Sequence, residues 1–236
     1  MATFALLVPV MNEARTLDAV LDRLLAIKRV DQCIVINDGS RDATADVLRK
    51  RLAAGDPRIR VVTHEHNRGK GAAIQSGLSA VTTDFAIVQD ADTEYDPDDL
   101  EKIFAALESK EAPVVFGSRF LRPNPNLYRS YLLGNKLLTG IANFLGGGNL
   151  TDAYTCYKGM SIGLWRRLQL KSAGFEIEAE ISMKCLLSGW RVLELPITYK
   201  PRSFAEGKKI RPKDAIKGIM KMLRVRLMKN RVADAA

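Results

Sequence analysis

Short apolar runs alternate with segments of helical character over the first half of the chain. The apolar runs predict five buried strands, at residues 4–10, 32–36, 59–63, 84–89 and 113–117. The segments between them predict helices at residues 14–27, 42–52 and 71–81, and Pro97 opens a further helix. This alternation predicts an α/β fold with a single, mainly parallel, Rossmann-like sheet flanked by helices.

The second half of the chain is less regular. Its pattern predicts helices at residues 131–145 and 175–187, an edge strand at 191–199 that contains Pro196, and a long basic helix at 212–231. A chain of 236 residues accommodates one α/β domain with a full core and a short appendage. We therefore expect one sheet domain that ends in a basic amphipathic helix.

The excess positive charge is concentrated in that last helix. The chain has a net charge of +9, and ten lysines and arginines between Lys208 and Arg231, against the single acid Asp214, account for all of it. Apolar residues recur there with helical spacing, at Ile216, Ile219, Met220, Leu223 and Leu227. This layout predicts an interfacial helix on anionic lipid, and the alternative is a helix packed on its own domain or on a partner. Aromatic residues make up only 7% and form no stacking array, so we expect no nucleic-acid partner.

Cysteine usage and hydropathy indicate the compartment. The three cysteines form no CxxC pair, and Cys33 and Cys185 lie in apolar stretches typical of buried thiols. The chain begins directly with a strand, without a signal-peptide layout, and no apolar run approaches the roughly 20 residues that span a bilayer. We expect a cytoplasmic protein in a reducing environment, peripheral on the inner face of the membrane.

Two carboxylates stand one residue apart at the end of the fourth predicted strand, in Asp90-Ala91-Asp92. In a turn after the strand both can reach one cation, and Glu94 adds a third oxygen donor. Hard oxygen ligands suit Mg²⁺ or Mn²⁺, which usually also bind substrate phosphates. Taken alone, the motif is common, and a turn and cap before the helix at Pro97 is the interpretation it favours.

Polar loops follow the other predicted strands as well. Asp38 lies in the turn after the second strand, Lys70 in a glycine-rich loop before a helix N-terminus, and Pro9, Asn12 and Glu13 after the first strand. For the turn that contains Asp38, a turn and N-cap for the next helix is the alternative interpretation. Because the carboxyl ends of parallel strands meet at one sheet edge, we expect nucleotide, phosphate and metal groups to bind there together.

The motifs VPVMNE, INDGSRDAT, NRGKGAA, DADTEYDP and GSRF occur in this order. Together they resemble glycosyltransferase family 2, whose nucleotide-sugar-binding domain has the GT-A fold. Within the family the chain is most similar to the dolichol-phosphate mannose synthase group and its bacterial polyprenyl-phosphate relatives. The resemblance covers roughly residues 3–209, which implies a glycosyltransferase domain at 1–209 and a basic tail at 210–236.

The resemblance implies roles for individual residues. Nucleotide-sugar binding falls to Pro9, Asn12, Glu13, Asp38, Lys70, Asp90 and Ala91, metal binding to Asp90, Asp92 and Glu94, and phosphate binding to Arg119, Arg129 and Arg202. Glu94 stands where the synthases commonly carry glutamine. The tail also departs from the family, which often has GESK where this chain has Glu-Gly-Lys-Lys at residues 206–209.

The resemblance implies an inverting transfer of a sugar from a nucleotide-sugar, either GDP-mannose or a UDP-hexose. A lipid phosphate acceptor is already ionised and needs cations rather than a base. A sugar-hydroxyl acceptor, the alternative, needs a carboxylate base, for which Asp152 is the first candidate, followed by Glu178 and Glu180. For these two glutamates, and more so for Glu180, a solvated helix face is the competing interpretation. A sugar nucleotidyltransferase fits less well, because the loop after the first strand is not glycine-rich.

Overall fold

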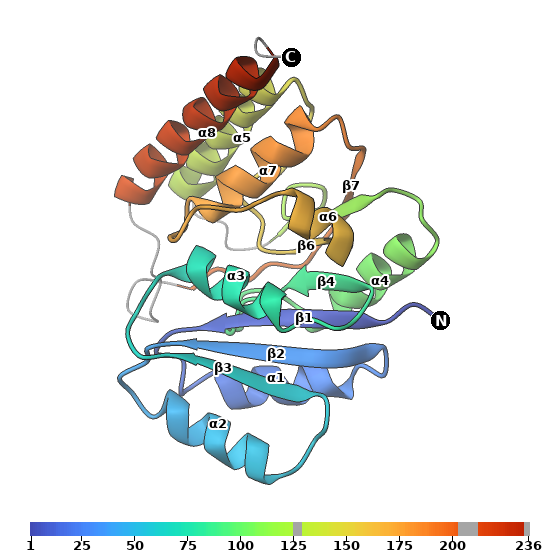
Figure 1. Cartoon of the computed structure of the whole chain (residues 1–236), viewed down its shortest axis with the longest axis vertical. Coiled ribbons are helices and arrows are strands. Elements are labelled where there is room, and N and C mark those ends of the chain that lie inside the picture. The colour runs from blue at the N-terminus through green and yellow to red at the C-terminus, as the bar shows by residue number, and fades with distance from the viewer. Residues whose placement is uncertain (125–128, 203–211, 234–236) are drawn as a thin grey trace.

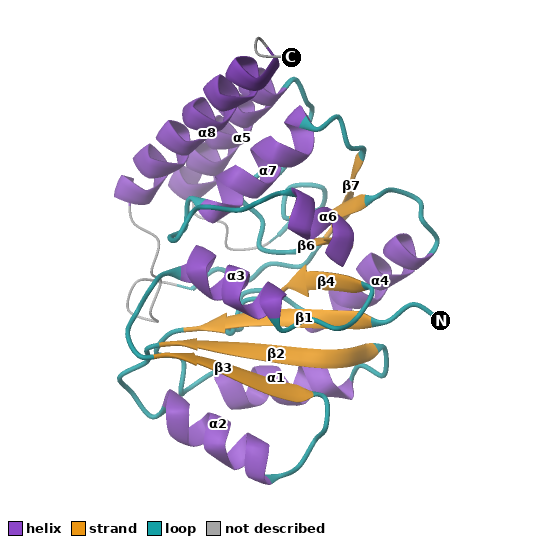
Figure 2. Ribbon diagram, viewed as in Figure 1, coloured by secondary structure: helices purple, strands orange, loops and turns teal. Residues whose placement is uncertain are grey.

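The structure is a computed structural model that describes residues 1–124, 129–202 and 212–233, with the backbone alone described for 129–131, 212 and 229–233. Seven strands form one sheet: β1 (Phe4–Val10), β2 (Val30–Asp38), β3 (Ile59–His64), β4 (Phe85–Val88), β5 (Val114–Ser118), β6 (Lys158–Ser161) and β7 (Val192–Pro196). Their spatial order is β3-β2-β1-β4-β6-β5-β7, and all neighbours are parallel except the two pairs made by β6 (Figures 1 and 2). The predicted mainly parallel α/β sheet is confirmed.

The helices follow the strands as the alternation predicts. They are α1 (Leu17–Ala26), α2 (Thr44–Ala53), α3 (Lys70–Ser79), α4 (Leu100–Glu108) after the 3-10 turn η1 (Pro97–Asp99), α5 (Arg129–Gly146), α6 (Ile162–Arg167), α7 (Ile177–Leu187) and α8 (Pro212–Ala233). The chain steps from β1 to β2 to β3 in one direction and then crosses back beyond β1 to β4. Right-handed crossovers therefore place α1 and α2 on one face of the sheet and α3 on the other. The reversal creates a switch point between β1 and β4, where open α/β sheets bind ligands.

The sequence pattern missed one strand and one helix, β6 and α6. The strand β6 consists of Lys-Gly-Met-Ser and therefore has no apolar run that the sequence pattern could detect. Its lysine, Lys158, can be buried because it forms an ion pair with Glu178 inside the protein. At Gly159 an added Cβ would lie 2.9 Å from the Ile87 side chain, so only glycine allows β6 to approach β4 this closely. The predicted edge strand is confirmed, since β7 lies at the end of the sheet.

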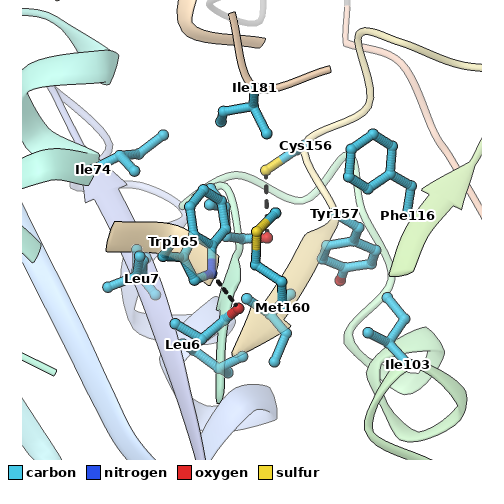
Figure 3. Packing of buried hydrophobic residues seen from close by; sticks show 14 of the residues in the cluster. Leu6, Leu7, Ile74, Ile103, Phe116, Cys156, Tyr157, Met160, Trp165 and Ile181 are labelled. Atoms are coloured by element: carbon cyan, nitrogen blue, oxygen red, sulfur yellow. Dashed lines mark hydrogen bonds between the residues drawn. The ribbon is translucent and has the colours of Figure 1, made fainter. Parts of the chain in front are cut away.

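The core at the junction of β4, β6 and β5 is closed by large side chains. Trp165 of α6 is buried and donates its indole N–H to the carbonyl of Ala86 at 3.0 Å (Figure 3). Cys156 is also buried, and its thiol lies 3.7 Å from the carbonyl of Val88. Burial raises the pKa of Cys33 and of Cys185 to about 12, so the predicted buried thiols are confirmed.

Helices α5, α7 and α8 lie together at one end of the molecule (Figure 1). The central helix α7 is buried on nearly all sides, and even Glu178 and Glu180 are 5% and 1% exposed. A solvated face for these glutamates is therefore wrong. Both carboxylates tolerate burial because they bind ammonium groups, Glu178 that of Lys158 and Glu180 that of Lys184.

The last helix, α8, packs on the domain with one face and exposes the other. Met222 and Val225 are buried, and Gly218 lies so close to Tyr154 that an added Cβ would be 1.8 Å from the tyrosine oxygen. The apolar residues left exposed on α8 are Ile216, Met220, Leu223, Leu227 and Met228. The packed helix and the exposed apolar stripe, which the sequence offers as alternatives, therefore coexist. None of the described helices is both long and apolar enough to span a membrane.

Candidate active site

A pocket of about 420 Å³ opens at the carboxyl edge of the parallel strands. The lining residues come from the ends of β1, β2 and β4, from the start of α3, and from three places later in the sequence: Pro9, Val10, Met11, Glu13, Asp38, Asn67, Gly69, Lys70, Ala73, Asp90, Ala91, Asp92, Glu94, Gly174, Phe175, Glu176, Arg202, Lys213, Asp214 and Lys217. The ends of β2, β1 and β4 lie together because these strands are neighbours around the switch point of the sheet. Nine of the thirteen residues predicted for the site line this pocket.

Three carboxylates, those of Asp90, Asp92 and Glu94, line one wall of the pocket. Burial raises the pKa of Asp92 to about 7, and the charges of Asp90 and Glu94 add to that rise, while Arg202 opposes it. The loop is held by its own backbone, since the Glu94 amide donates to the Asp92 carboxylate at 3.0 Å. The pocket therefore concentrates negative charge that a cation would stabilise.

Arg202 supplies a positive charge that partly compensates the carboxylates of this wall. Its guanidinium lies 2.5 Å from Asp92 and donates to the two carboxylate oxygens of Glu13 at 3.1 and 3.2 Å. Its backbone amide donates to Glu94 at 2.6 Å, and the other oxygen of Glu94 accepts from the Tyr199 hydroxyl at 2.9 Å. One arginine thus links the loop after β1 to the loop after β4.

Lys70 neutralises Asp90, the first of the two aspartates in the pocket wall. Its ammonium lies 2.7 Å from Asp90 and 2.9 Å from Glu178 of α7. Burial acts to lower the pKa of Lys70, but the negative charges of Asp90 and Glu178 act with other neighbours to keep that pKa well above its usual range. Glu178 also binds Lys158 at 2.5 Å, so a chain of four alternating charges runs from the core to the pocket.

Asp38 lies in the pocket wall, where its carboxylate organises the glycine-rich loop. It accepts hydrogen bonds from the amides of Arg68 and Gly69, each at 2.8 Å, and lies 2.7 Å from the imidazole of His64. Gly69 has φ = 97°, a left-handed conformation that favours glycine, and an added Cβ would lie 2.5 Å from the carbonyl of Ala173. Asp38 therefore fixes the loop that places Lys70 at the start of α3.

Three predicted site residues are described outside the pocket lining. Arg119 and Asp152 are buried against each other, with two guanidinium–carboxylate contacts of 2.7 and 2.8 Å. Asn12 ties the loop after β1 to the loop after β2, since its side-chain oxygen accepts from the Arg41 amide at 2.8 Å. Arg129 begins α5, and its side chain falls outside the described residues.

The sequence analysis missed two groups that the fold brings to the pocket. Residues 174–176 reach it because the turn before α7 packs on the glycine-rich loop, where the Ala72 amide donates to the Ala173 carbonyl at 3.0 Å. Lys213, Asp214 and Lys217 reach it because α8 lies over α7. Neither placement has a local signal, since each depends on the packing of distant helices.

The acidic wall fits a divalent cation by its chemistry, with three carboxylates whose charges disfavour one another. In the described part of the chain, however, no three acidic, histidine or cysteine side chains converge as a preformed metal site. The reason is visible in their contacts, because Asp90 faces Lys70, Asp92 faces Arg202 and Glu94 faces Tyr199. Each of the three carboxylates therefore has a partner inside the protein.

A mainly parallel sheet of this kind, with helices on both faces, is a GT-A fold, and solved GT-A glycosyltransferases share it. Glucosyl-3-phosphoglycerate synthase from Mycobacterium tuberculosis superposes with a TM-score of 0.71 at 20% identity, over 95% of this chain and 80% of that one. The synthase has been solved with Mn²⁺, UDP-glucose and phosphoglyceric acid. At this identity the similarity shows the fold alone.

The chain belongs to glycosyl transferase family 2, whose model matches residues 5–168. It is 26% identical to the UDP-N-acetylglucosamine–dolichyl-phosphate N-acetylglucosaminyltransferase of Methanococcus voltae, over 86% of this chain and 88% of the relative. It is 26% identical to the undecaprenyl-phosphate mannosyltransferase of Micrococcus luteus, over 86% and 85%. It is 27% identical to the low-salt glycan biosynthesis hexosyltransferase Agl6 of Haloferax volcanii, over 85% of this chain but only 48% of that relative. The predicted family is confirmed.

Proposed function

We propose that this glycosyltransferase is a metal-dependent, inverting enzyme that transfers a sugar from a nucleotide-sugar to a polyprenyl or dolichyl phosphate. The observation that carries the proposal is the pocket at the switch point, where Asp90, Asp92 and Glu94 face Lys70 and Arg202. A nucleoside diphosphate is an anionic leaving group, and this wall offers both cations and the carboxylates that hold a metal.

Asp90 and Asp92, with Glu94 beside them, would hold Mg²⁺ or Mn²⁺. When bound, the ion offsets the charge that develops on the leaving diphosphate. The chain's own residues prepare that site. Asp38 fixes the glycine-rich loop, and Glu178 holds Lys70 beside Asp90. We assign the nucleoside to the side of the pocket lined by Pro9, Glu13 and Asp38.

Two observations support a phosphate acceptor over a sugar hydroxyl. The relatives from Methanococcus voltae and Micrococcus luteus carry a lipid phosphate in their names. The first candidate base, Asp152, is fully buried and bound to Arg119, so its carboxylate is neutralised rather than poised to accept a proton. A phosphate needs no base, because it is ionised at neutral pH.

A donor and acceptor panel tests the proposal. The purified protein is incubated with GDP-mannose, UDP-glucose or UDP-N-acetylglucosamine, with undecaprenyl phosphate in detergent, and with Mg²⁺, Mn²⁺ or EDTA. We expect release of nucleoside diphosphate and a lipid-linked sugar with inverted anomeric configuration for one donor, and no turnover with EDTA. Transfer to a sugar hydroxyl but not to the lipid phosphate would establish the alternative acceptor class.

The acceptor places the enzyme at a membrane surface, and we assign this contact to the exposed face of α8, on the inner face of the membrane. The exposed apolar stripe of α8 is flanked by Lys213, Lys217 and Arg224, which is charge complementary to anionic lipid. The test is sedimentation with vesicles of phosphatidylcholine, with and without phosphatidylglycerol. We expect binding only with the anionic lipid and its loss in a Met220→Glu/Leu227→Glu variant, whereas equal binding by the variant would remove the role of α8.

A further inference from the structure

The first turns of α8 line the same pocket as the acidic wall. Lys213 and Lys217 stand four residues apart on this helix, so they lie on one side of it, one above the other. Both are exposed and both border the pocket, together with Asp214. The charged end of α8 therefore belongs to the pocket, although the rest of the helix packs on α7.

The cations of the pocket fall into two kinds. Lys70 is bound by Asp90 and Glu178, and Arg202 by Glu13 and Asp92, so the charge of each is compensated inside the protein. Within the part of the chain that the structure describes, Lys213 and Lys217 form no ion pair. They are the pocket cations whose charge an incoming anion can meet without first breaking an internal contact.

The position of Lys217 around the helix connects two surfaces. Successive residues of an α-helix are about 100° apart, so Lys217 lies between Ile216 and Gly218. Ile216 belongs to the exposed apolar stripe, and Gly218 is buried against Tyr154. Lys213, one turn earlier, continues the same side of the helix to the pocket rim. A molecule with an apolar chain on the stripe and an anionic head would meet these two lysines where the pocket begins.

We propose that Lys213 and Lys217 bind the phosphate of the lipid acceptor at the mouth of the pocket, so that α8 is an acceptor-binding element of the active site. This inference rests on the proposed function and specifies where its acceptor binds. The donor diphosphate is assigned to the other side of this site, with Asp90 and Asp92, which line the same pocket. Lysine suits the acceptor side because its ammonium is a mobile point charge that can follow a phosphate into the pocket.

The test uses the full chain and geranyl phosphate, a short polyprenyl phosphate that is soluble without a membrane. The variant Lys213→Gln/Lys217→Gln removes both charges and leaves polar, somewhat shorter side chains. The matched control is Arg226→Gln, because Arg226 is an exposed cation of the same helix and does not line the pocket. Binding of geranyl phosphate is titrated by calorimetry without donor, and KM values for acceptor and donor are measured separately.

We expect the double variant to bind geranyl phosphate at least about tenfold more weakly and to raise the acceptor KM by a similar factor, which corresponds to about 1.4 kcal/mol. The donor KM should stay within about twofold of the wild type, and Arg226→Gln should leave both values unchanged. Unchanged acceptor binding in the double variant would overturn the inference, and so would a rise in the donor KM alone. Failure of the proposed function gives a different result, since the wild-type protein would then transfer no sugar to any polyprenyl phosphate, while the binding titration still decides whether the lysines hold the anion.

Discussion

The pocket wall at the sheet edge and the helical layer of α5, α7 and α8 use charge in opposite ways. At the sheet edge, acids and bases are buried beside each other and held by backbone hydrogen bonds, as with Asp92, Arg202 and Glu94. On α8, lysines and apolar side chains are exposed together on the outer surface. The first arrangement suits a small ligand that enters a prepared site, and the second suits an extended, amphiphilic one. Four predictions test this contrast, from the largest expected effect to the smallest.

The largest effect should come from the acidic wall. Asp92→Asn keeps the size of the side chain but removes a charge from the pocket, so turnover should fall by about 10²- to 10³-fold or more. Metal-dependent donor binding, followed by thermal shift with Mn²⁺, should be lost as well. The control is Asp98→Asn, because the Asp98 side chain is 85% exposed and pairs only at the surface with Arg23. Full activity in the Asp92 variant would refute the assignment of the metal site.

The pH dependence of this site follows from the same carboxyl. The pKa of Asp92 is raised from 3.8 to about 7, so in the absence of metal the folded protein favours its protonated form. Because the folded state disfavours the ionised form of Asp92, the free energy of unfolding falls as the pH rises from about 4 to 7. Metal-dependent donor binding, which needs the carboxylate, should weaken as the pH falls below 7. In thermal unfolding without metal, Asp92→Asn should be more stable than the wild type at pH 8 but not at pH 4. A gain of equal size at both pH values would contradict the raised pKa of Asp92.

The charge chain between the core and the pocket should show an intermediate effect. Glu178→Gln leaves Lys70 and Lys158 without their shared carboxylate, which should cost about 3 kcal/mol of stability and raise the donor KM. Glu180→Gln is the matched control, because Glu180 is equally buried on α7 but binds Lys184 and the backbone amide of Ser172, neither of which lines the pocket. It should lower the melting temperature with no change in the donor KM. Equal kinetic effects in both variants would mean that Glu178 acts only through stability.

The smallest effects should separate the packed helix α8 from the exposed face of α5. Gly218→Ala places a Cβ 1.8 Å from the oxygen of Tyr154, and overpacking should cost about 1–3 kcal/mol. Tyr154→Phe should partly rescue it, because it removes that oxygen, which has no hydrogen-bond partner among the described residues. Gly140→Ala in α5 meets nothing within 4 Å and should instead stabilise the protein by about 0.5–1 kcal/mol. Chemical denaturation measures all three, and a destabilised Gly140 variant would show that the exposed face of α5 is covered.

The parallel half of the fold was predictable because its signals are local. Apolar runs placed β1 to β5 to within about two residues, and the motifs around Asp38, Lys70 and Asp90 follow strand ends that one sheet edge must bring together. The second half depends on contacts between residues far apart in the chain. In the sequence, Lys158 is typical of a surface residue, and its burial depends on the ion pair with Glu178, so the hydrophobic pattern did not predict β6. The lysines of α8 were correctly placed on a basic helix, but their position at the pocket follows from tertiary packing alone.

The antiparallel strand β6 has one further consequence. It lies beside β5 in the sheet, although the segment between Ser118 and Lys158 contains the whole of α5 and Asp152. That segment is thus an excursion that leaves and re-enters the sheet at adjacent strands, so the pairing of β5 with β6 sets where both of its ends lie. Exchanging this excursion between related enzymes is therefore a route to chimaeras that keep one set of binding preferences while acquiring another.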